Sequence, residues 1–215
     1  MSFSLRWLGH ASFRVKAEGK TIYIDPYEGD YSEKADLILV THSHHDHCDI
    51  EKIRKIRKPD TIVVAPEDCV SKIGGRVKLI KAGQEMTFGR IKIKAVESYN
   101  VKRFKSPSNP FHPKGFGIGY LITFEEKTVY HAGDSDFVPE MEHLGPVDVA
   151  LLPSGGTYTM DNPEAAEAAL AINPRIAIPI HRWDTDPEEF KKKVEARSKV
   201  KIVVLPVGEE FQVVS

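Results

Sequence analysis

The hydrophobic positions along the chain follow two periods, which predict strands and helices. Phe3, Leu5 and Trp7 alternate with polar residues, which is the pattern of a half-buried strand. Short, continuous apolar runs such as 36–40 and 147–152 predict strands buried on both faces. By these criteria strands are predicted at 3–7, 12–16, 21–24, 36–40, 61–65, 77–80, 85–88, 91–96, 118–124, 128–131, 147–152, 175–180, 201–205 and 210–214.

Helical periodicity and capping residues predict the helices. Ile50, Ile53 and Ile56 share one face of an amphipathic segment. Asn162 followed by Pro163 predicts a helix start with Asn162 as the cap. Helices are predicted at 49–58, 67–72, 139–144, 162–172 and 187–197.

The order of these elements predicts the fold class. Consecutive strands dominate the first half, and strands alternate with helices in the second half. This order favours an α/β protein built as a four-layer αββα sandwich, with two mixed sheets and the helices outside. No repeat, low-complexity tract or linker interrupts the pattern, so one domain spanning 1–215 is predicted.

The segment 97–117 is much longer than the other predicted connections between elements. It combines a basic run at 102–105 with prolines at 107, 110 and 113. Irregular loops of this length are uncommon in compact domains and often act as lids or binding loops. The segment is therefore predicted to fold over a functional site.

Composition and charge narrow the class of protein. The chain has 215 residues, of which 41% are hydrophobic and 28% charged, as in soluble globular proteins. A net charge of −1 disfavours nucleic acid and anionic membranes as partners. No apolar run approaches the roughly 20 residues of a membrane helix. The start of the chain lacks the pattern of a signal peptide, so a cytoplasmic location is expected.

Candidate chemistry is concentrated between the predicted strand 36–40 and the helix that follows it. His42, His44, Asp46 and His47 have the spacing H-x-H-x-D-H. Imidazole and carboxylate groups are ordinary ligands of zinc and similar metals. Because a strand-to-helix loop lets His42 and His44 point one way and Asp46 and His47 another, the motif favours two adjacent metals.

Further candidate ligands follow three other predicted strands. Asp134 comes after 128–131 in a turn that Gly133 permits, and could bridge two metals. His181 ends the strand 175–180. Asn100, or His112 further along the same segment, is the third candidate, because ligands gather at the carboxyl ends of strands.

Taken together, the motifs resemble those of the metallo-β-lactamase fold superfamily. Within it, the chain is most similar to the ascorbate-6-phosphate-lactonase-like metal-dependent hydrolases. The resemblance covers nearly the whole chain and is carried by 7–13, 24–26, 41–47, 112–115, 131–134, 152–160 and 179–181.

The resemblance implies a set of metal ligands. It assigns His42 and His44 to a first metal, Asp46, His47 and His181 to a second, and Asp134 to the bridge between them. Many members place a further histidine soon after a strand that here ends near Val96, where this chain has Ser98-Tyr99-Asn100. The first metal is therefore completed by either His112, which is favoured, or Asn100. Two zinc ions are expected; manganese suits the site if Asn100 or water is a ligand.

The implied activity is hydrolysis by a metal-bound hydroxide, with a small ester, phosphodiester or lactone as the substrate. Asp46 could orient the attacking water. Candidate donors to the substrate are His10, Tyr99, Lys114, His131 and the hydroxyl groups of 155–159.

The basic residues also bear on the substrate. The cations of the 97–117 segment suit a phosphorylated small molecule, and a homo-oligomer is compatible with the sequence. Two alternatives to the hydrolase remain: a nuclease acting on RNA or DNA, and a non-catalytic protein that binds metal or a small ligand.

Overall fold

The computed structural model describes residues 3–213, which fall into two compact units. Residues up to Lys81 and from Leu205 onward form the first unit, and Ala82–Val204 form the second. Val214, the last residue of the predicted strand 210–214, lies outside the described residues. That the whole chain forms one domain stays a prediction.

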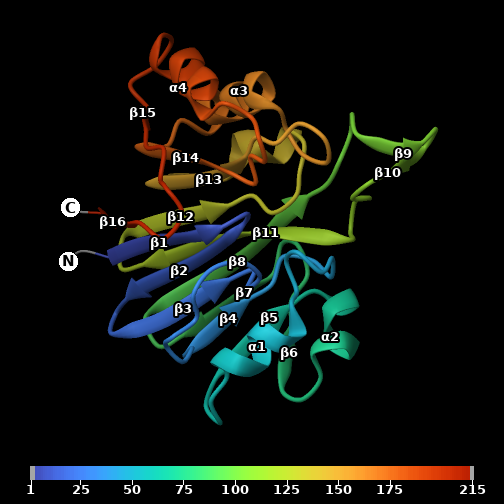
Figure 1. Ribbon diagram of the computed structural model, residues 1–215, viewed down its shortest axis with the longest axis vertical. Coiled ribbons are helices and arrows are strands. Elements are labelled where there is room, and N and C mark those ends of the chain that lie inside the picture. The colour runs from blue at the N-terminus through green and yellow to red at the C-terminus, as the bar shows by residue number, and fades with distance from the viewer. Residues whose placement is uncertain (1–2, 214–215) are drawn as a thin grey trace. The chain divides into compact units, whose positions relative to one another are not determined.

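The first unit contains a seven-stranded mixed sheet in the order β16-β1-β2-β3-β4-β5-β6 (Figure 1). The strands from β16 to β3 are antiparallel neighbours, and those from β3 to β6 are parallel. Its elements are β1 (Phe3–Gly9), β2 (Ser12–Ala17), β3 (Lys20–Ile24), β4 (Leu37–Leu39), α1 (Ile50–Ile56), β5 (Ile62–Ala65), α2 (Glu67–Ile73), β6 (Val77–Leu79) and β16 (Glu210–Val213).

Both helices of the first unit pack on one face of this sheet. Ile53 of α1 and Ile73 of α2 belong to the same apolar cluster as Tyr23, Ile38 and Val63 on the strands. Burying each such side chain stabilises the fold by about 1.5–3 kcal/mol. The apolar stripe predicted on the first helix is therefore the face that fixes α1, and with it the end of the loop that contains His42, His44 and His47.

The second unit contains another seven-stranded mixed sheet, in the order β15-β14-β13-β12-β11-β8-β7. Neighbours are antiparallel from β7 to β12 and parallel from β12 to β15. Its elements are β7 (Glu85–Phe88), β8 (Ile91–Ser98), β9 (Phe104–Ser106), β10 (Asn109–Pro110), β11 (Gly117–Phe124), β12 (Lys127–His131), the 3₁₀-helix η1 (Pro139–His143), β13 (Val149–Pro153), α3 (Asn162–Ile172), β14 (Ile176–Ile180), α4 (Pro187–Glu195) and β15 (Lys201–Ile202).

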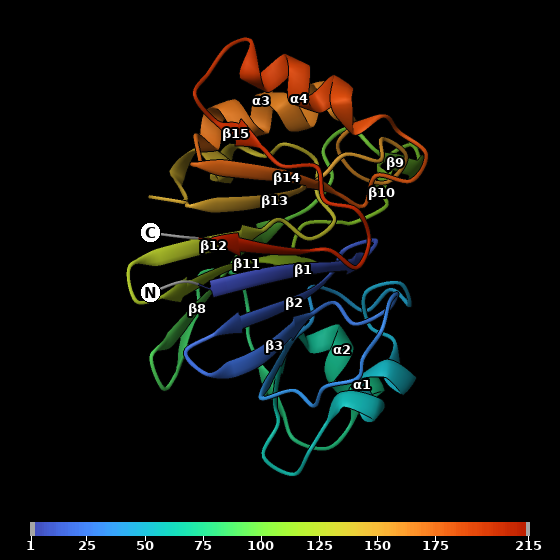
Figure 2. The same ribbon diagram turned by 60° about the vertical axis from the view of Figure 1, so that its left-hand side comes forward.

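Helices α3 and α4 lie side by side against the parallel part of this sheet (Figure 2). Ala166 and Ala169 of α3 and Phe190 of α4 share an apolar cluster with Leu152 of β13. Because alanine side chains are small, α3 can approach the sheet closely, whereas α4 contributes the large, fully buried side chain of Phe190. The predicted two mixed sheets with accompanying helices are confirmed.

The predicted cap of α3 is wrong by one residue. Asp161, not Asn162, has the extended backbone of a cap, and its side chain accepts a hydrogen bond from the Glu164 backbone N–H. Asn162 is the first helical residue, and its Nδ2 instead donates to the Asp186 carbonyl at 2.8 Å. Two cap-forming residues in succession made the choice ambiguous from sequence.

The 97–117 segment has more regular structure than predicted. Strand β8 extends to Ser98, and β9 and β10 pair as a two-stranded hairpin that projects from the second unit (Figure 1). No helix within 3–213 combines the length and apolar character needed to cross a membrane.

Candidate metal centre

The β4–α1 loop of the first unit brings its histidines together through a tight turn. Backbone N–H groups of His47 and Cys48 donate to the His44 carbonyl at 3.1 and 2.9 Å. Asp49 then caps α1 by accepting hydrogen bonds from Glu51 and Lys52. Turn and cap together fix where each side chain of the motif points.

Ring nitrogens within this loop have the spacing of metal ligands. His42 Nε2 lies 3.1 Å from His44 Nδ1, and the His42 and His47 ring centroids are 4.1 Å apart. Two ligands bonded at about 2.1 Å in tetrahedral geometry lie roughly 3.4 Å apart. The His42–His44 pair is close to that spacing, so the donor set of the first unit fits a zinc-like ion.

A second group of possible ligands adjoins the first. One ligand atom from each of His10, Asp46 and His47 lies within 4.8 Å of the other two. His10 Nε2 is 3.1 Å from Asp46 Oδ2, and the Trp7 indole N–H donates to the His10 carbonyl at 3.0 Å. His10 therefore contacts Asp46. The sequence had predicted His10 only as a donor to the substrate.

Asp25 is a functional candidate that sequence reasoning missed. It is fully buried, and its Oδ2 lies 2.7 Å from His47 Nδ1. The same carboxylate accepts hydrogen bonds from the Thr41 backbone N–H and hydroxyl, at 2.7 and 2.6 Å. A carboxylate on the far nitrogen of a histidine fixes its tautomer and raises its basicity as a ligand. Asp25 thus leaves Nε2 of His47 as the atom available to a metal.

In the second unit, Asp134 stands between two histidines. Its Oδ2 lies 3.4 Å from His112 Nε2 and 3.3 Å from His181 Nε2. All three residues are at least 95% buried, with exposed fractions of 2%, 5% and 1% for His112, Asp134 and His181. One carboxylate oxygen close to two imidazoles is the arrangement expected of a bridging ligand.

Hydrogen bonds hold the turn with Asp134 in place, and an uncommon backbone conformation presents His181. Ser98 Oγ donates to the Asp134 carbonyl at 3.1 Å, and the Gly133 N–H donates to His131 Nδ1 at 3.1 Å. The predicted donor His131 is thus a buried support of the turn that presents Asp134. His181 follows β14 directly and has a φ of +44°, an uncommon conformation for a histidine.

Asn100 and His112, the two alternatives for the remaining ligand, contact each other. Asn100 Oδ1 lies 2.8 Å from His112 Nδ1 and accepts the His112 backbone N–H at 2.8 Å. The amide oxygen is therefore engaged with the imidazole, whose Nε2 faces Asp134. This arrangement favours His112 as the ligand and Asn100 as the residue that orients it.

Tyr99 and Lys114, both predicted to contact the substrate, are brought to Glu140. Lys114 Nζ donates to Glu140 Oε1 at 2.6 Å and lies 4.7 Å from the centre of the Tyr99 ring. The Tyr99 hydroxyl also donates to Glu140. The hydrogen bond from Lys114 holds the pKa of Glu140 below its ordinary value. Contact of either residue with a substrate stays a prediction.

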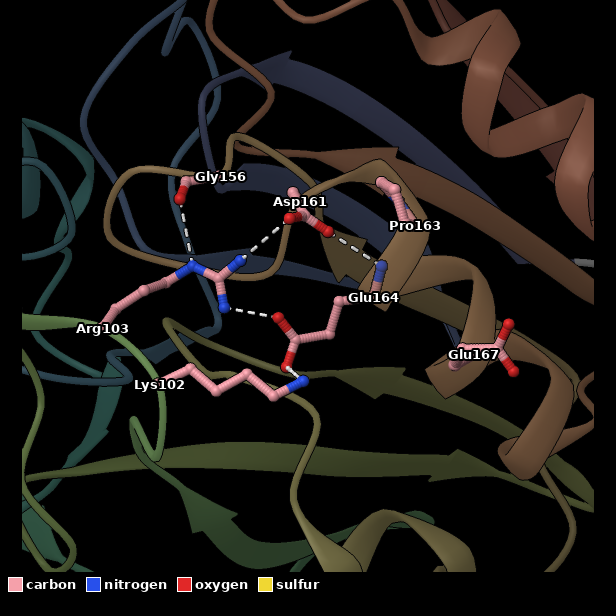
Figure 3. Close-up of a pocket in the computed structure, with 7 residues that line it drawn as sticks. All are labelled: Lys102, Arg103, Gly156, Asp161, Pro163, Glu164 and Glu167. Atoms are coloured by element: carbon pink, nitrogen blue, oxygen red, sulfur yellow. Dashed lines mark hydrogen bonds and ion pairs between the residues drawn. The ribbon is translucent and has the colours of Figure 1, made fainter.

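Arg103, another cation of this segment, anchors the segment within the second unit. Its Nε donates to the Gly156 carbonyl at 3.0 Å, and its Nη1 contacts Glu164 (Figure 3). The same Nη1 also contacts the buried Asp136. The side chain lies in a cavity of about 550 Å³ lined by Lys102, Arg103, Gly156, Asp161, Pro163, Glu164 and Glu167. None of the predicted metal ligands lines this cavity, and Lys102 there pairs with Glu164 at 3.1 Å.

Comparison with known proteins decides the family. Residues 4–181 match the profile of the beta-lactamase superfamily domain. A UPF0173 metal-dependent hydrolase of Pyrococcus furiosus is 38% identical over 225 residues, covering 96% of this chain and 97% of that protein. The chain belongs to the UPF0173 family of metal-dependent hydrolases. A family member from Methanopyrus kandleri is 36% identical, with 97% of this chain and 99% of that protein covered.

Solved structures share the fold of this chain. Igni18, a metallo hydrolase from Ignicoccus hospitalis, has a TM-score of 0.83 and 27% identity, with 100% of both chains covered. The metallo-beta-lactamase fold protein YhfI of Bacillus subtilis, 12% identical over 98% of this chain and 99% of that one, has a TM-score of 0.80 and shows the shared fold. The predicted superfamily is confirmed; the narrower resemblance to ascorbate-6-phosphate lactonases stays a prediction.

Proposed function

We propose that this UPF0173 protein is a dinuclear metal-dependent hydrolase that cleaves a small ester, phosphodiester or lactone. The ligands would be His42, His44, Asp46 and His47 of the first unit, and His112, Asp134 and His181 of the second. The observation that carries the proposal is the ligand-like spacing within each unit, and family membership supports assigning both sets to one centre.

The chemistry of the donors supports zinc as the metal. The set consists of imidazoles and carboxylates, and the amide oxygen of Asn100, which would suit a harder ion such as manganese, is bonded to His112. When bound, such ions lower the pKa of water toward about 7 and polarise the bond to be cleaved.

Residues of the first unit would move the proton. Asp46, whose side chain is 34% exposed, can accept the proton of an attacking water, and His10 lies 3.1 Å from it. Because the Trp7 indole fixes the His10 backbone, the His10 ring keeps its position beside Asp46 as the carboxylate changes protonation state. This arrangement supports roles for both predicted catalytic residues, Asp46 and His10, and adds a contact between them that was not predicted.

Metal analysis with a matched pair of variants tests the proposal. We expect about two zinc ions per chain after dialysis against metal-free buffer, and a melting temperature that falls on chelation, since a bound ion stabilises the folded state. His44→Ala should reduce the metal content. His45→Ala, at the neighbouring exposed position of the same loop, should not.

A substrate panel completes the test. The metal-loaded protein should hydrolyse at least one of a chromogenic phosphodiester, a lactone and a thioester. Metal binding without turnover on the panel would favour the non-catalytic alternative, and cleavage of RNA or DNA alone would favour the nuclease. No zinc uptake by the parent protein would contradict the proposal. A small-molecule substrate, a cytoplasmic location and assembly into a homo-oligomer stay predictions.

A further inference from the structure

An exposed tryptophan lies beside one of the proposed ligands of the second unit. Trp183 is 56% exposed. The centroids of the Trp183 and His181 rings are 5.4 Å apart, with an interplanar angle of 81°. Trp183 has a φ of +44°, which is strained for a bulky residue. Such strain persists where the surrounding structure imposes it, and it clusters at ligand-binding sites.

A glycine fixes where the Trp183 ring lies. A Cβ atom added at Gly155 would be 2.5 Å from Trp183 Cδ1 and 2.4 Å from the His181 carbonyl oxygen. Any side chain at this position would therefore push the indole away from the loop that follows β13. The ring is held against the backbone with much of its surface facing solvent, which is the arrangement of a binding platform.

A second exposed aromatic residue is linked to the other proposed histidine ligand. Tyr158 is 40% exposed, and its ring packs edge-on against Phe111 at 4.8 Å. Its carbonyl accepts a hydrogen bond from Asn100 Nδ2 at 2.9 Å, and Asn100 in turn holds His112. Trp183 thus contacts His181 through its ring, whereas Tyr158 is linked to His112 through its backbone carbonyl and Asn100.

We infer that Trp183 recognises an aryl group next to the scissile bond of the substrate. This inference rests on the proposed function and names its substrate class: aryl esters or aryl phosphodiesters. Aromatic rings gain specific stacking and edge-to-face contacts with such a group. Recognition of a phosphorylated substrate by the lysines of the 97–117 segment has less support, because Lys102 pairs with Glu164 and Lys114 pairs with Glu140.

Binding of two matched ligands tests the inference without requiring turnover. Phenyl phosphate and methyl phosphate share the phosphate and differ in the aryl group. Calorimetric titration of the zinc-loaded protein should give tighter binding of phenyl phosphate by roughly 3- to 10-fold. Phenyl phosphate should also quench the fluorescence of Trp183, which dominates the solvent-accessible signal because Trp7 is only 4% exposed.

Variants separate stacking from structural effects. Trp183→Gly suits the positive φ and should abolish the preference for phenyl phosphate, while Trp183→Phe should retain most of it. Phe104→Ala removes another aromatic side chain of similar exposure, 43%, and should leave the preference unchanged. Zinc content should be the same in all three variants.

The outcomes distinguish this inference from the proposed function. Failure of the parent protein to bind zinc would contradict the proposed function alone, and the aryl preference would then be measured on the protein as isolated. Equal affinity for both ligands, or a preference that survives in Trp183→Gly, would overturn the inference. So would a change in oligomeric state of Trp183→Gly without a change in preference, which would assign the surface to contact between copies.

Discussion

The two units present their candidate ligands in different ways. The first unit gathers four of them in the single loop 42–47, and one buried carboxylate, Asp25, serves both His47 and the Thr41 backbone at the start of that loop. The second unit takes His112, Asp134 and His181 from three separate loops, with Asn100 beside His112 and His131 supporting the turn before Asp134. A loss at Asp25 should therefore disturb several ligands at once, whereas most losses in the second unit should stay local.

Asp134 is the exception in the second unit, and its removal should have the largest effect. Its Oδ2 contacts both histidines, so Asp134→Ala leaves two buried imidazoles without the carboxylate between them. We expect loss of most bound metal and a fall in activity of about 1000-fold or more, equivalent to the several kcal/mol that a metal supplies.

Elemental analysis and kinetics measure this effect, with Asp184→Ala at an exposed position as the control. An Asp134→Ala protein that kept its metals and near-normal turnover would show that Asp134 is not the bridge. It would also show that loss of Asp134 has no wider effect than loss of another ligand of the second unit.

Asp25→Ala should disturb several ligands of the loop 42–47 at once. The buried carboxylate accepts two hydrogen bonds from Thr41 and orients His47. We expect metal affinity to fall about 10- to 100-fold and the free energy of unfolding to fall by about 3 kcal/mol. Metal titration and urea unfolding measure the two effects. Asp30→Asn, an exposed carboxyl change in the same unit, is the control, and a match to it would refute the role of Asp25.

Asn100→Ala should produce a smaller, local loss. Without the amide oxygen, His112 can rotate and change tautomer, and metal affinity should drop roughly 10-fold. Asn100→Asp keeps an acceptor for His112 Nδ1 and should recover most of the affinity. If His112→Ala bound metal more tightly than Asn100→Ala, then Asn100 rather than His112 would be the ligand.

Lys114→Met should have the smallest effect, and that effect should depend on pH. The pKa of Glu140 is lowered in the folded state, chiefly by its hydrogen bond with Lys114. The pair therefore stabilises the protein at pH values above the ordinary carboxyl pKa, and this contribution is lost as the pH falls through the folded-state value.

We expect Lys114→Met to melt slightly below the parent at pH 7, and the difference to vanish in acid, while metal content is unchanged at pH 7. A raised Michaelis constant for anionic substrates only would instead support the predicted contact between Lys114 and the substrate. A melting difference that persists in acid would show that the ion pair is not its cause.

A feature could be predicted from the sequence when its residues lie close together along the chain, and was missed when they lie far apart. The motif 42–47 is contiguous, so its metal chemistry was evident without a structure. Asp25 and Thr41 meet because β3 and β4 pair in parallel, with Ile24 opposite Leu39. Asp25 does have a sequence signal, since it is an aspartate directly after a buried strand. That signal alone does not distinguish a functional aspartate from one in a turn.

Parts of the second unit were harder to predict for other reasons. The β9–β10 hairpin is short, with two prolines and one lysine in place of alternating apolar residues, so nothing in the pattern indicated strands. Strand β15 has only two residues and pairs with Ile176 and Ala177, which leaves Pro179 beyond that pairing. This explains how a proline fits in an interior strand, where its missing N–H would otherwise disrupt the sheet.

The anchoring of Arg103 has a consequence for the evolution of the family. Arg103 and Asn100 tie the two bases of the hairpin, on one side to Asp136 and Glu164 and on the other to His112. The residues between these ties, 104–110, can therefore be exchanged or extended while the geometry of His112 is preserved. We expect relatives to differ most in this stretch, so that new substrate preferences arise there without rebuilding the metal ligands.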